Sequence, residues 1–246
     1  ALRWRKPCLW LACLWLLWLP AVHAGIADAP GEDLQVSLVT YGPGDIYWER
    51  FGHDAIEIRD RVSGQAFNFN YGVFDFEQKN FLLNFARGRM RYSIDAEPTP
   101  EDIGWYVDAG RWVQRQHLAL TPRQAASLRD FLLWNLRPQN AQYNYDYYTN
   151  NCSIRVRDAL DHVLGGALKA QLQAVESPIT YRGETDRLMS GQPWLMLLLD
   201  LGLGPYADQP LTRWQTAFIP MRLMHDVRDV RVTDGNGGTR PLVLDD

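Results

Sequence analysis

The sequence predicts an α+β fold in which an antiparallel sheet packs against helices. Three observations favour this class: apolar and polar residues alternate in the first third of the chain, a turn signal separates two such segments, and later segments repeat apolar residues at helical spacing. With 246 residues, of which 46% are hydrophobic and 22% charged, the chain can bury a substantial core without a disulfide or a metal.

The first 24 residues have the pattern of a secretory signal peptide. Arg3, Arg5 and Lys6 form a basic start, an apolar run extends from Cys8 to Leu19, and Val22-His23-Ala24 provides a small-residue cleavage site. We expect cleavage near Ala24 and export of the remaining chain. The apolar run of roughly a dozen residues is shorter than the about 20 that span a bilayer.

The strands are predicted from alternation and turns. Leu34, Val36 and Leu38 alternate with polar residues and predict a first strand. Residues 54–58 and 65–70 predict a second and a third strand, and Ser63-Gly64 between them is typical of a two-residue hairpin turn. In that register Val62 would pair with Gln65.

The helices are predicted from spacing and from their starts. Thr99 and Thr121 are each followed by proline, so each is expected to cap a helix. The predicted elements after the hairpin are a helix over 74–86, a strand through Met90, Tyr92 and Ile94, a short helix from Thr99, a strand over 111–120, a helix over 121–136, and a helix from Cys152 that Gly165-Gly166 ends. We predict three regions: a signal peptide (1–24), a thiol-enzyme domain (25–165), and a mostly helical C-terminal extension (166–246) packed on that domain.

The cysteine count indicates a functional thiol. Of the three cysteines, Cys8 and Cys13 leave with the signal peptide, so the exported chain keeps Cys152 alone and cannot form an internal disulfide. A lone thiol in an oxidising compartment is open to irreversible oxidation, although a buried cysteine can also pack as a small hydrophobe. Cleavage also changes the formal net charge from −4 to −7, since three positive and no negative charges leave, which argues against a nucleic-acid partner.

The residues around Cys152 favour its activation. Asn150 and Asn151 are good N-cap residues, so Cys152 is expected at the first or second position of its helix. Unpaired backbone N–H groups and the helix dipole there would lower the pKa of the thiol and could bind an oxyanion. The sequence therefore predicts a nucleophile with part of its transition-state stabilisation.

A thiol nucleophile needs a base, and the histidines after the signal peptide can be compared. His162 lies ten residues along the same helix, about 15 Å from the cysteine. His117 lies inside an alternating strand, which is typical of a structural histidine, and His225 has no local signature. His53 follows Gly52 at the start of a strand, where a side chain can project over the sheet end, so we predict His53 as the base.

A third group should orient the imidazole. Asn70 lies on the same face as His53, but the two-residue turn would place it opposite Glu57, roughly 13 Å along the strand. A longer loop or a bulge would be needed to bring Asn70 to His53. Tyr71 and Tyr145 are alternative polar neighbours, and with Asn151 they form the group expected to contact substrate or an oxyanion.

Several of these positions together resemble the Lnb N-terminal periplasmic domain family, over about Val36 to Val163. The resemblance is carried by Gly52-His53, Asn70-Tyr71-Gly72 with Phe74, Gly88 with Tyr92, Tyr143 with Tyr145, and Asn151-Cys152 followed by Arg155 and Asp158. It implies a periplasmic location, a permuted papain-like (NlpC-type) fold related to lecithin:retinol acyltransferase-like enzymes, and a cysteine-dependent acyltransferase acting on lipoproteins. The family's histidine and cysteine fall on His53 and Cys152.

Three functions remain open at this level. The first is a thiol acyltransferase or acyl hydrolase that forms a thioester acyl-enzyme on lipoproteins or phospholipids, with a peripheral contact to the inner membrane. The second is a peptidoglycan amidase or peptidase, and the third is a non-catalytic envelope assembly factor whose Cys152 is buried and unreactive. We expect no metal and no cofactor in any of them.

Overall fold

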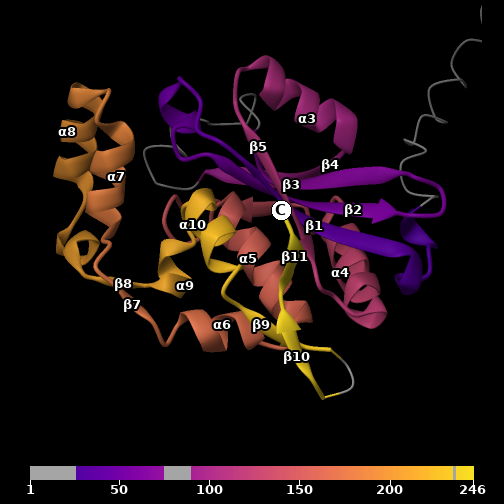
Figure 1. The fold of residues 1–246 in the computed structure, drawn as a ribbon. Coiled ribbons are helices and arrows are strands. Elements are labelled where there is room, and N and C mark those ends of the chain that lie inside the picture. Colours follow the sequence, from indigo (N-terminus) through magenta and orange to yellow (C-terminus); the bar gives the residue numbers. More distant parts are fainter. Residues whose placement is uncertain (1–25, 75–89, 235–236) are drawn as a thin grey trace, which may run out of the picture.

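A seven-stranded sheet forms the centre of the computed structural model, which describes residues 26–74, 90–234 and 237–246 (Figure 1). Every neighbouring pair in the sheet is antiparallel. In spatial order the strands are β11 (Val243–Asp245), β5 (Val113–Leu118), β1 (Leu34–Tyr41), β2 (His53–Asp60), β3 (Ala66–Phe74), β4 (Arg91–Pro98) and β6 (Gln142–Asn144). The predicted α+β class with an antiparallel sheet and helices is confirmed.

Helices cover both faces of this sheet. On one face α3 (Thr99–Asp108) contacts β3, β4 and β5, and on the other α4 (Pro122–Asn135), α5 (Cys152–Val163) and α10 (Pro220–Asp226) pack together (Figure 1). The other elements are α6 (Ala167–Leu172), α7 (Tyr181–Met189), α8 (Pro193–Gly202), α9 (Arg213–Thr216), the 3-10 turns Gly31–Asp33, Tyr47–Glu49 and Pro205–Asp208, and two small ladders, β7 (Glu176–Ser177) with β8 (Leu211–Thr212) and β9 (Arg231–Thr233) with β10 (Thr239–Pro241).

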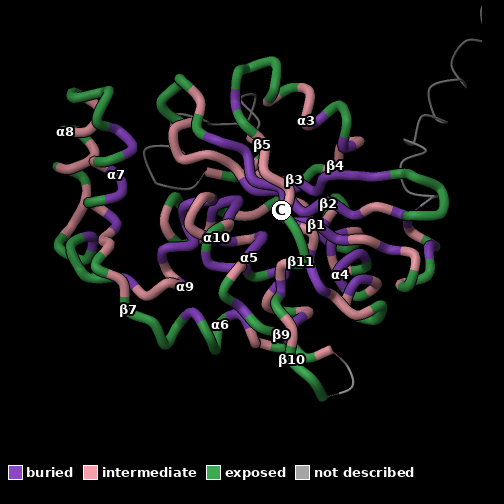
Figure 2. Tube along the Cα trace, in the orientation of Figure 1, coloured by how far each residue is buried: buried purple, intermediate pink, exposed green. Residues whose placement is uncertain are grey.

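The main core lies between the sheet and the α4–α5 layer. Leu38, Ile56 and Phe69 from the strands meet Leu128 and Leu160 from the two helices, and all five are essentially inaccessible. Figure 2 shows the central strands of the sheet as mostly buried. Each such side chain contributes about 1.5–3 kcal/mol by leaving water. This packing holds the start of α5 against β2 and β3.

The β2–β3 hairpin differs from its predicted register. Residues 61–64 form the turn, and the last pair of the ladder joins Arg59 to Ala66. The Asp60 carboxylate organises this longer turn by accepting hydrogen bonds from the Val62 N–H at 2.9 Å and the Ser63 hydroxyl at 2.5 Å. The prediction that Val62 pairs with Gln65 is therefore wrong.

The two predicted helix caps have different outcomes. Thr121 caps α4 through a capping box with Gln124, as its sequence predicts. Thr99 does not cap α3, because its hydroxyl instead donates to the Asn68 side-chain oxygen at 2.9 Å. The predicted helix over 74–86 and the predicted signal peptide lie largely or wholly outside the described residues.

The C-terminal segment returns to the central sheet. Strand β11 pairs with β5, and α10 packs against β1 and α5. The segment predicted as an extension thus contributes a strand to the main sheet. No helix in the described ranges is long and apolar enough to cross a bilayer.

Candidate active site

Helix α5 begins at Cys152, with Asn151 as its N-cap. The Asn151 side-chain oxygen accepts from the Ile154 N–H at 2.9 Å, and its amide nitrogen donates to the carbonyls of Tyr147 and Phe218. The prediction that an asparagine cap places Cys152 in the first turn is confirmed. Since the Asn151 amide hydrogens are already used, the oxyanion donors available here are backbone N–H groups.

The position of His53 depends on the glycine before it. Gly52 has φ +79°, and a Cβ there would lie 2.8 Å from both the Met221 sulfur and the Tyr41 carbonyl oxygen. Only glycine fits this close, left-handed turn without strain. The turn delivers His53 at the first position of β2, half-buried at the end of the sheet.

Cys152 and His53 line one cavity of about 540 Å³. Gly72 also lines it, and a Cβ at Gly72 would lie 3.4 Å from the Cys152 Cβ. Within the described part of the chain, no hydrogen bond joins the Cys152 sulfur to the imidazole. Such contacts are often long in a free enzyme and shorten in its substrate complex, so the sulfur and imidazole flank a space that a substrate can enter.

Asn70 orients the imidazole, and Asp102 orients Asn70. The His53 Nε2 lies 3.0 Å from the Asn70 side-chain oxygen, and the Asn70 amide nitrogen donates to Asp102 Oδ1 at 3.0 Å. Because a carboxylate only accepts, the Asn70 oxygen must face His53, and Nε2 must carry the proton. The imidazole Nδ1 is then unprotonated and free to accept a proton.

The Asp102 carboxylate is held by further buried groups. Its Oδ2 accepts from the Tyr41 hydroxyl and from the Asn68 amide nitrogen at 2.7 Å. Burial, followed by the charge of Asp102, raises the pKa of Tyr41 far above its ordinary value, so Tyr41 remains a donor. This network joins α3 to β1 and β3 and fixes the orienting groups from the face opposite α5.

The resting charge state differs from the sequence-based prediction. Burial, followed by the Asp54 carboxylate, raises the pKa of the Cys152 thiol to about 12, and backbone N–H groups of Asp54, Ser153 and Cys152 only partly offset this. Burial lowers the pKa of His53, although the hydrogen bond with Asn70 acts to raise it. The predicted lowering of the thiol pKa is wrong, because desolvation of the sulfur exceeds the effect of the helix start.

Asp54 ties β2 to the first turn of α5. Its carboxyl is fully buried, accepts from Thr40 Oγ1 at 2.6 Å, and lies 2.6 Å from Ser153 Oγ, which is also 2.7 Å from the Ala217 carbonyl oxygen. Burial raises the pKa of Asp54 to about 6. The contact between Ser153 and Asp54 therefore holds the neighbours of Cys152 and His53 in the sequence against each other.

The cavity has mainly aromatic walls. Tyr145 is part of them and stacks on Tyr92 at 4.0 Å between ring centroids, whereas Tyr71 is buried in the main core and does not line the cavity. The aromatic lining residues are Tyr47, Trp48, Phe74, Tyr92, Tyr106, Tyr145 and Tyr147. Of the predicted site residues, Cys152, His53 and Tyr145 share the cavity, and Asn70 joins them through His53.

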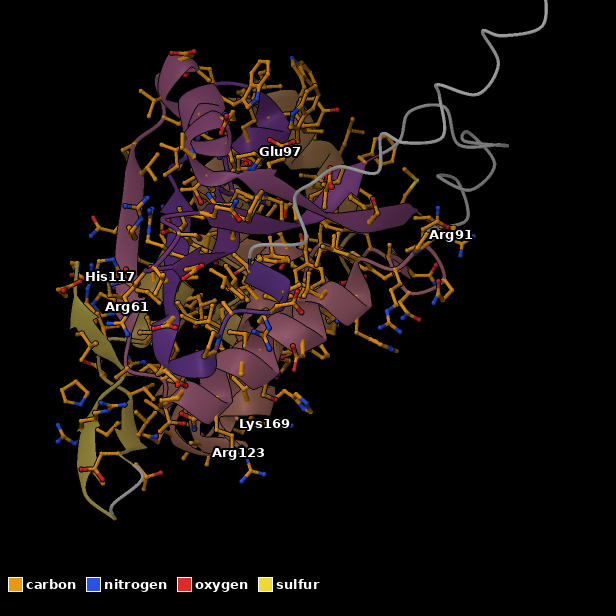
Figure 3. The ribbon with its side chains drawn as sticks, turned by 90° about the vertical axis from the view of Figure 1, so that its right-hand side faces the viewer. Arg61, Arg91, Glu97, His117, Arg123 and Lys169 are labelled. Atoms are coloured by element: carbon orange, nitrogen blue, oxygen red, sulfur yellow. The ribbon has the colours of Figure 1, made fainter. Side chains whose placement is uncertain are left out.

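The structure adds Asp102 and Arg111 to the site, and sequence reasoning missed both. Asp102 falls in the short helix predicted from Thr99, and Arg111 begins the strand predicted over 111–120, and neither was given a role in the site. His117 does not line the cavity and instead contacts Asp245 across the β5–β11 pair. Figure 3 shows His117 beside the C-terminal strands. No local sequence signal marks either residue, because their burial and their partners, Asn70 for Asp102 and Gly42 for Arg111, come from distant segments.

A family model described as the Lnb N-terminal periplasmic domain matches residues 23–187. The chain belongs to the Lnb N-terminal periplasmic domain family. The matched span contains the cavity residues His53, Arg111 and Cys152, and the family's description supports an exported, periplasmic location for this Lnb-type domain. Neither the curated proteins nor the solved structures compared with the chain give a match.

Proposed function

We propose that this Lnb-type domain is a periplasmic cysteine-dependent acyltransferase or acyl hydrolase, with Cys152 as nucleophile and His53 as base. The observation that carries the proposal is the hydrogen-bond chain from Asp102 through Asn70 to His53, which assigns the proton to Nε2 and leaves Nδ1 unprotonated on a histidine that lines the same cavity as Cys152. A base held in one tautomer by a second group is the arrangement that nucleophilic catalysis requires.

The neutral resting pair defines the chemistry. As the Cys152 sulfur attacks an ester carbonyl and forms the C–S bond, its proton moves to His53 Nδ1. The imidazolium then gives that proton to the leaving alcohol oxygen as the C–O bond breaks, which leaves a thioester on Cys152. An amine or water next attacks the thioester, loses its proton to Nδ1, and releases the thiol, which takes the proton back.

The same arrangement supports the finer fold assignment. A cysteine at a helix start, a histidine at a strand start and an asparagine on the neighbouring strand is the set expected of a permuted papain-like enzyme. The cysteine follows the histidine in this chain, and a triad is defined by geometry rather than by order. We therefore propose that the domain is a papain-like scaffold of the NlpC type.

The walls of the cavity favour an acyl chain over a wall peptide. Aromatic rings from several segments surround the Cys152 end, and apolar burial contributes about 25 cal/mol per Å² of covered chain. The walls also carry tyrosine hydroxyls, Glu49 and Arg111, so the preference rests on the amount of aromatic ring surface and not on a lack of polar groups. Lipoproteins and phospholipids are thus the substrates that we propose.

Helix α8 supports a peripheral contact with the membrane that would hold such substrates. Its ten residues include none that is buried, and Trp194, Leu198 and Leu201 are 81%, 66% and 77% exposed. At about 15 Å the helix is too short to span a bilayer, but it can lie in the interface with tryptophan at headgroup level. In Figure 1, α7 and α8 form one edge of the molecule. We propose that this edge contacts the inner membrane.

The test is to detect an acyl group on Cys152. The purified protein is incubated with phospholipid vesicles, or separately with peptidoglycan, and the intact mass and the Cys152 peptide are measured. We expect an added acyl mass with vesicles, and none in Cys152→Ala or His53→Ala. Release of wall peptides without acylation would transfer the assignment to an amidase, and no product with either substrate would favour the non-catalytic alternative.

A further inference from the structure

Arg111 lines the cavity and is 92% buried. Its Nε donates to the Gly42 carbonyl oxygen at 2.6 Å, and its guanidinium carbon lies 4.6 Å from the centre of the Tyr106 ring. Its Nη2 is buried without a hydrogen-bond partner among the described residues. A permanently charged group is therefore held in the wall of the cavity with part of its hydrogen-bonding capacity unused.

Two other arginines are buried to a similar degree, and their contacts differ. Arg129 pairs with Asp130 and donates to the Ala29 carbonyl, and Arg157 pairs with Asp158 and donates to the Trp214 carbonyl at 2.6 Å. Both have a carboxylate on the guanidinium. Among the described residues, Arg111 has one backbone acceptor and one aromatic ring as partners, and neither neutralises its charge.

An uncompensated buried cation costs several kcal/mol, so a protein retains one where a ligand supplies the missing anion. The surroundings agree with a ligand in the cavity. His53 and Tyr106 stack with ring centroids 5.9 Å apart, and Arg111 lies against the same Tyr106 ring. An anion at Arg111 would thus lie on the His53 side of the aromatic walls, beside the reacting carbonyl.

We propose that Arg111 forms an anion subsite that binds the phosphate of a phospholipid acyl donor while the ester carbonyl of that lipid reaches Cys152. The inference deepens the proposed function and rests on it for the identity of the donor. In a glycerophospholipid a few bonds separate the phosphate from the acyl esters, so one molecule can place its phosphate on the guanidinium and its chain along the aromatic walls. The planar guanidinium suits a phosphate because it offers two parallel donors.

Binding is tested without turnover in the full chain carrying Cys152→Ala. Three probes are titrated by calorimetry below their aggregation concentrations: monododecyl phosphate, dodecyl maltoside and inorganic phosphate. We expect the phosphate amphiphile to bind most tightly, and Arg111→Gln to weaken it about 10- to 100-fold while leaving the maltoside unchanged. Arg123→Gln is the matched control, because Arg123 is exposed at the start of α4, away from the cavity (Figure 3).

Two results would overturn the subsite. One is equal binding of dodecyl phosphate and dodecyl maltoside by the protein with Arg111 intact. This comparison does not depend on whether an Arg111 variant folds. The other is full affinity for dodecyl phosphate in folded Arg111→Gln. Inorganic phosphate binding as tightly as dodecyl phosphate would overturn the lipid as its source. Because the probes contain no ester, these results are independent of whether Cys152 forms an acyl-enzyme.

Discussion

Replacing Asp102 by asparagine should move the proton of His53 from Nε2 to Nδ1 and so remove the base. Two donors, the Tyr41 hydroxyl and the Asn68 amide, point at Asp102 Oδ2, whereas Oδ1 receives only the Asn70 amide. The oxygen of the introduced amide would therefore face the two donors, and its NH₂ group would face Asn70. Asn70 would turn over and present its own NH₂ group to His53 Nε2, which must then be an acceptor.

The magnitude follows from the hydrogen bonds involved. In the native protein a reversed Asn70 would lose one bond to a carboxylate, worth about 1.5–3 kcal/mol, so the productive orientation is favoured by roughly 10- to 150-fold. The substitution reverses that preference. In a serine triad, trapping the wrong imidazole tautomer lowers kcat by about 10⁴, and we expect a decrease of about 10² to 10⁴ here.

The assay combines kinetics with a direct view of the tautomer. Acylation of Cys152 by a long-chain p-nitrophenyl ester is followed by absorbance, and ¹⁵N NMR identifies which His53 nitrogen is protonated. Tyr41→Phe is the control: it removes one donor to Asp102 but leaves Asn68 and Asn70 bound, so it should reduce stability by about 1–3 kcal/mol without changing the tautomer. A folded Asp102→Asn protein with native acylation rate and a proton on Nε2 would refute the reasoning.

Three further predictions follow from the buried titratable groups and from the exposed apolar side chains of α8. As pH increases, the acylation rate should rise through a His53 pKa below 6.5 and then stay level to about pH 9. The thiol pKa of about 12 lies above this range, so the pH–rate profile should have no second limb there. A bell-shaped profile centred near neutrality would contradict this prediction. Since the folded pKa of Asp54 is raised to about 6, the folded state binds a proton that the unfolded chain has released, and the Asp54 contribution to unfolding free energy should fall by about 2 kcal/mol from pH 4 to 7. Urea denaturation at both pH values should show this fall in unfolding free energy in the native protein but not in Asp54→Asn. The same fall in both proteins would disprove the prediction. Replacing Trp194, Leu198 and Leu201 together by serine should weaken co-sedimentation with phospholipid vesicles at least about tenfold at unchanged stability, and undiminished binding would exclude α8 as the membrane contact.

Local signals in the sequence predicted several of the elements and the two residues that we propose as nucleophile and base. Alternation predicted β1 and β2, and the Asn151 cap predicted where α5 begins. These signals act over a few residues, so they can be read without a partner segment. The comparison of histidines placed His53 at a strand start, and the structure brings it to the cavity that Cys152 lines.

The β2–β3 hairpin shows how a small error in the predicted turn length becomes a large error in the predicted position of a site residue. A turn longer by two residues, organised by Asp60, changes the partner of Asn70 from Glu57 to Ala55 and brings its oxygen to 3.0 Å from His53. Turn length is determined by side-chain hydrogen bonds within the loop, which Ser63-Gly64 alone does not reveal.

The sequence by itself predicted the fold class, one cysteine after the proposed signal peptide, the start of its helix and a histidine suited to be its base, because each prediction uses residues close together in the chain. Only the tertiary structure decided the tautomer of His53, the raised pKa of Cys152 and the burial of Arg111 without a carboxylate partner in the part of the chain that the structure describes. Those properties depend on desolvation and on partners more than 30 residues away, such as Asp102 for Asn70 and Gly42 for Arg111.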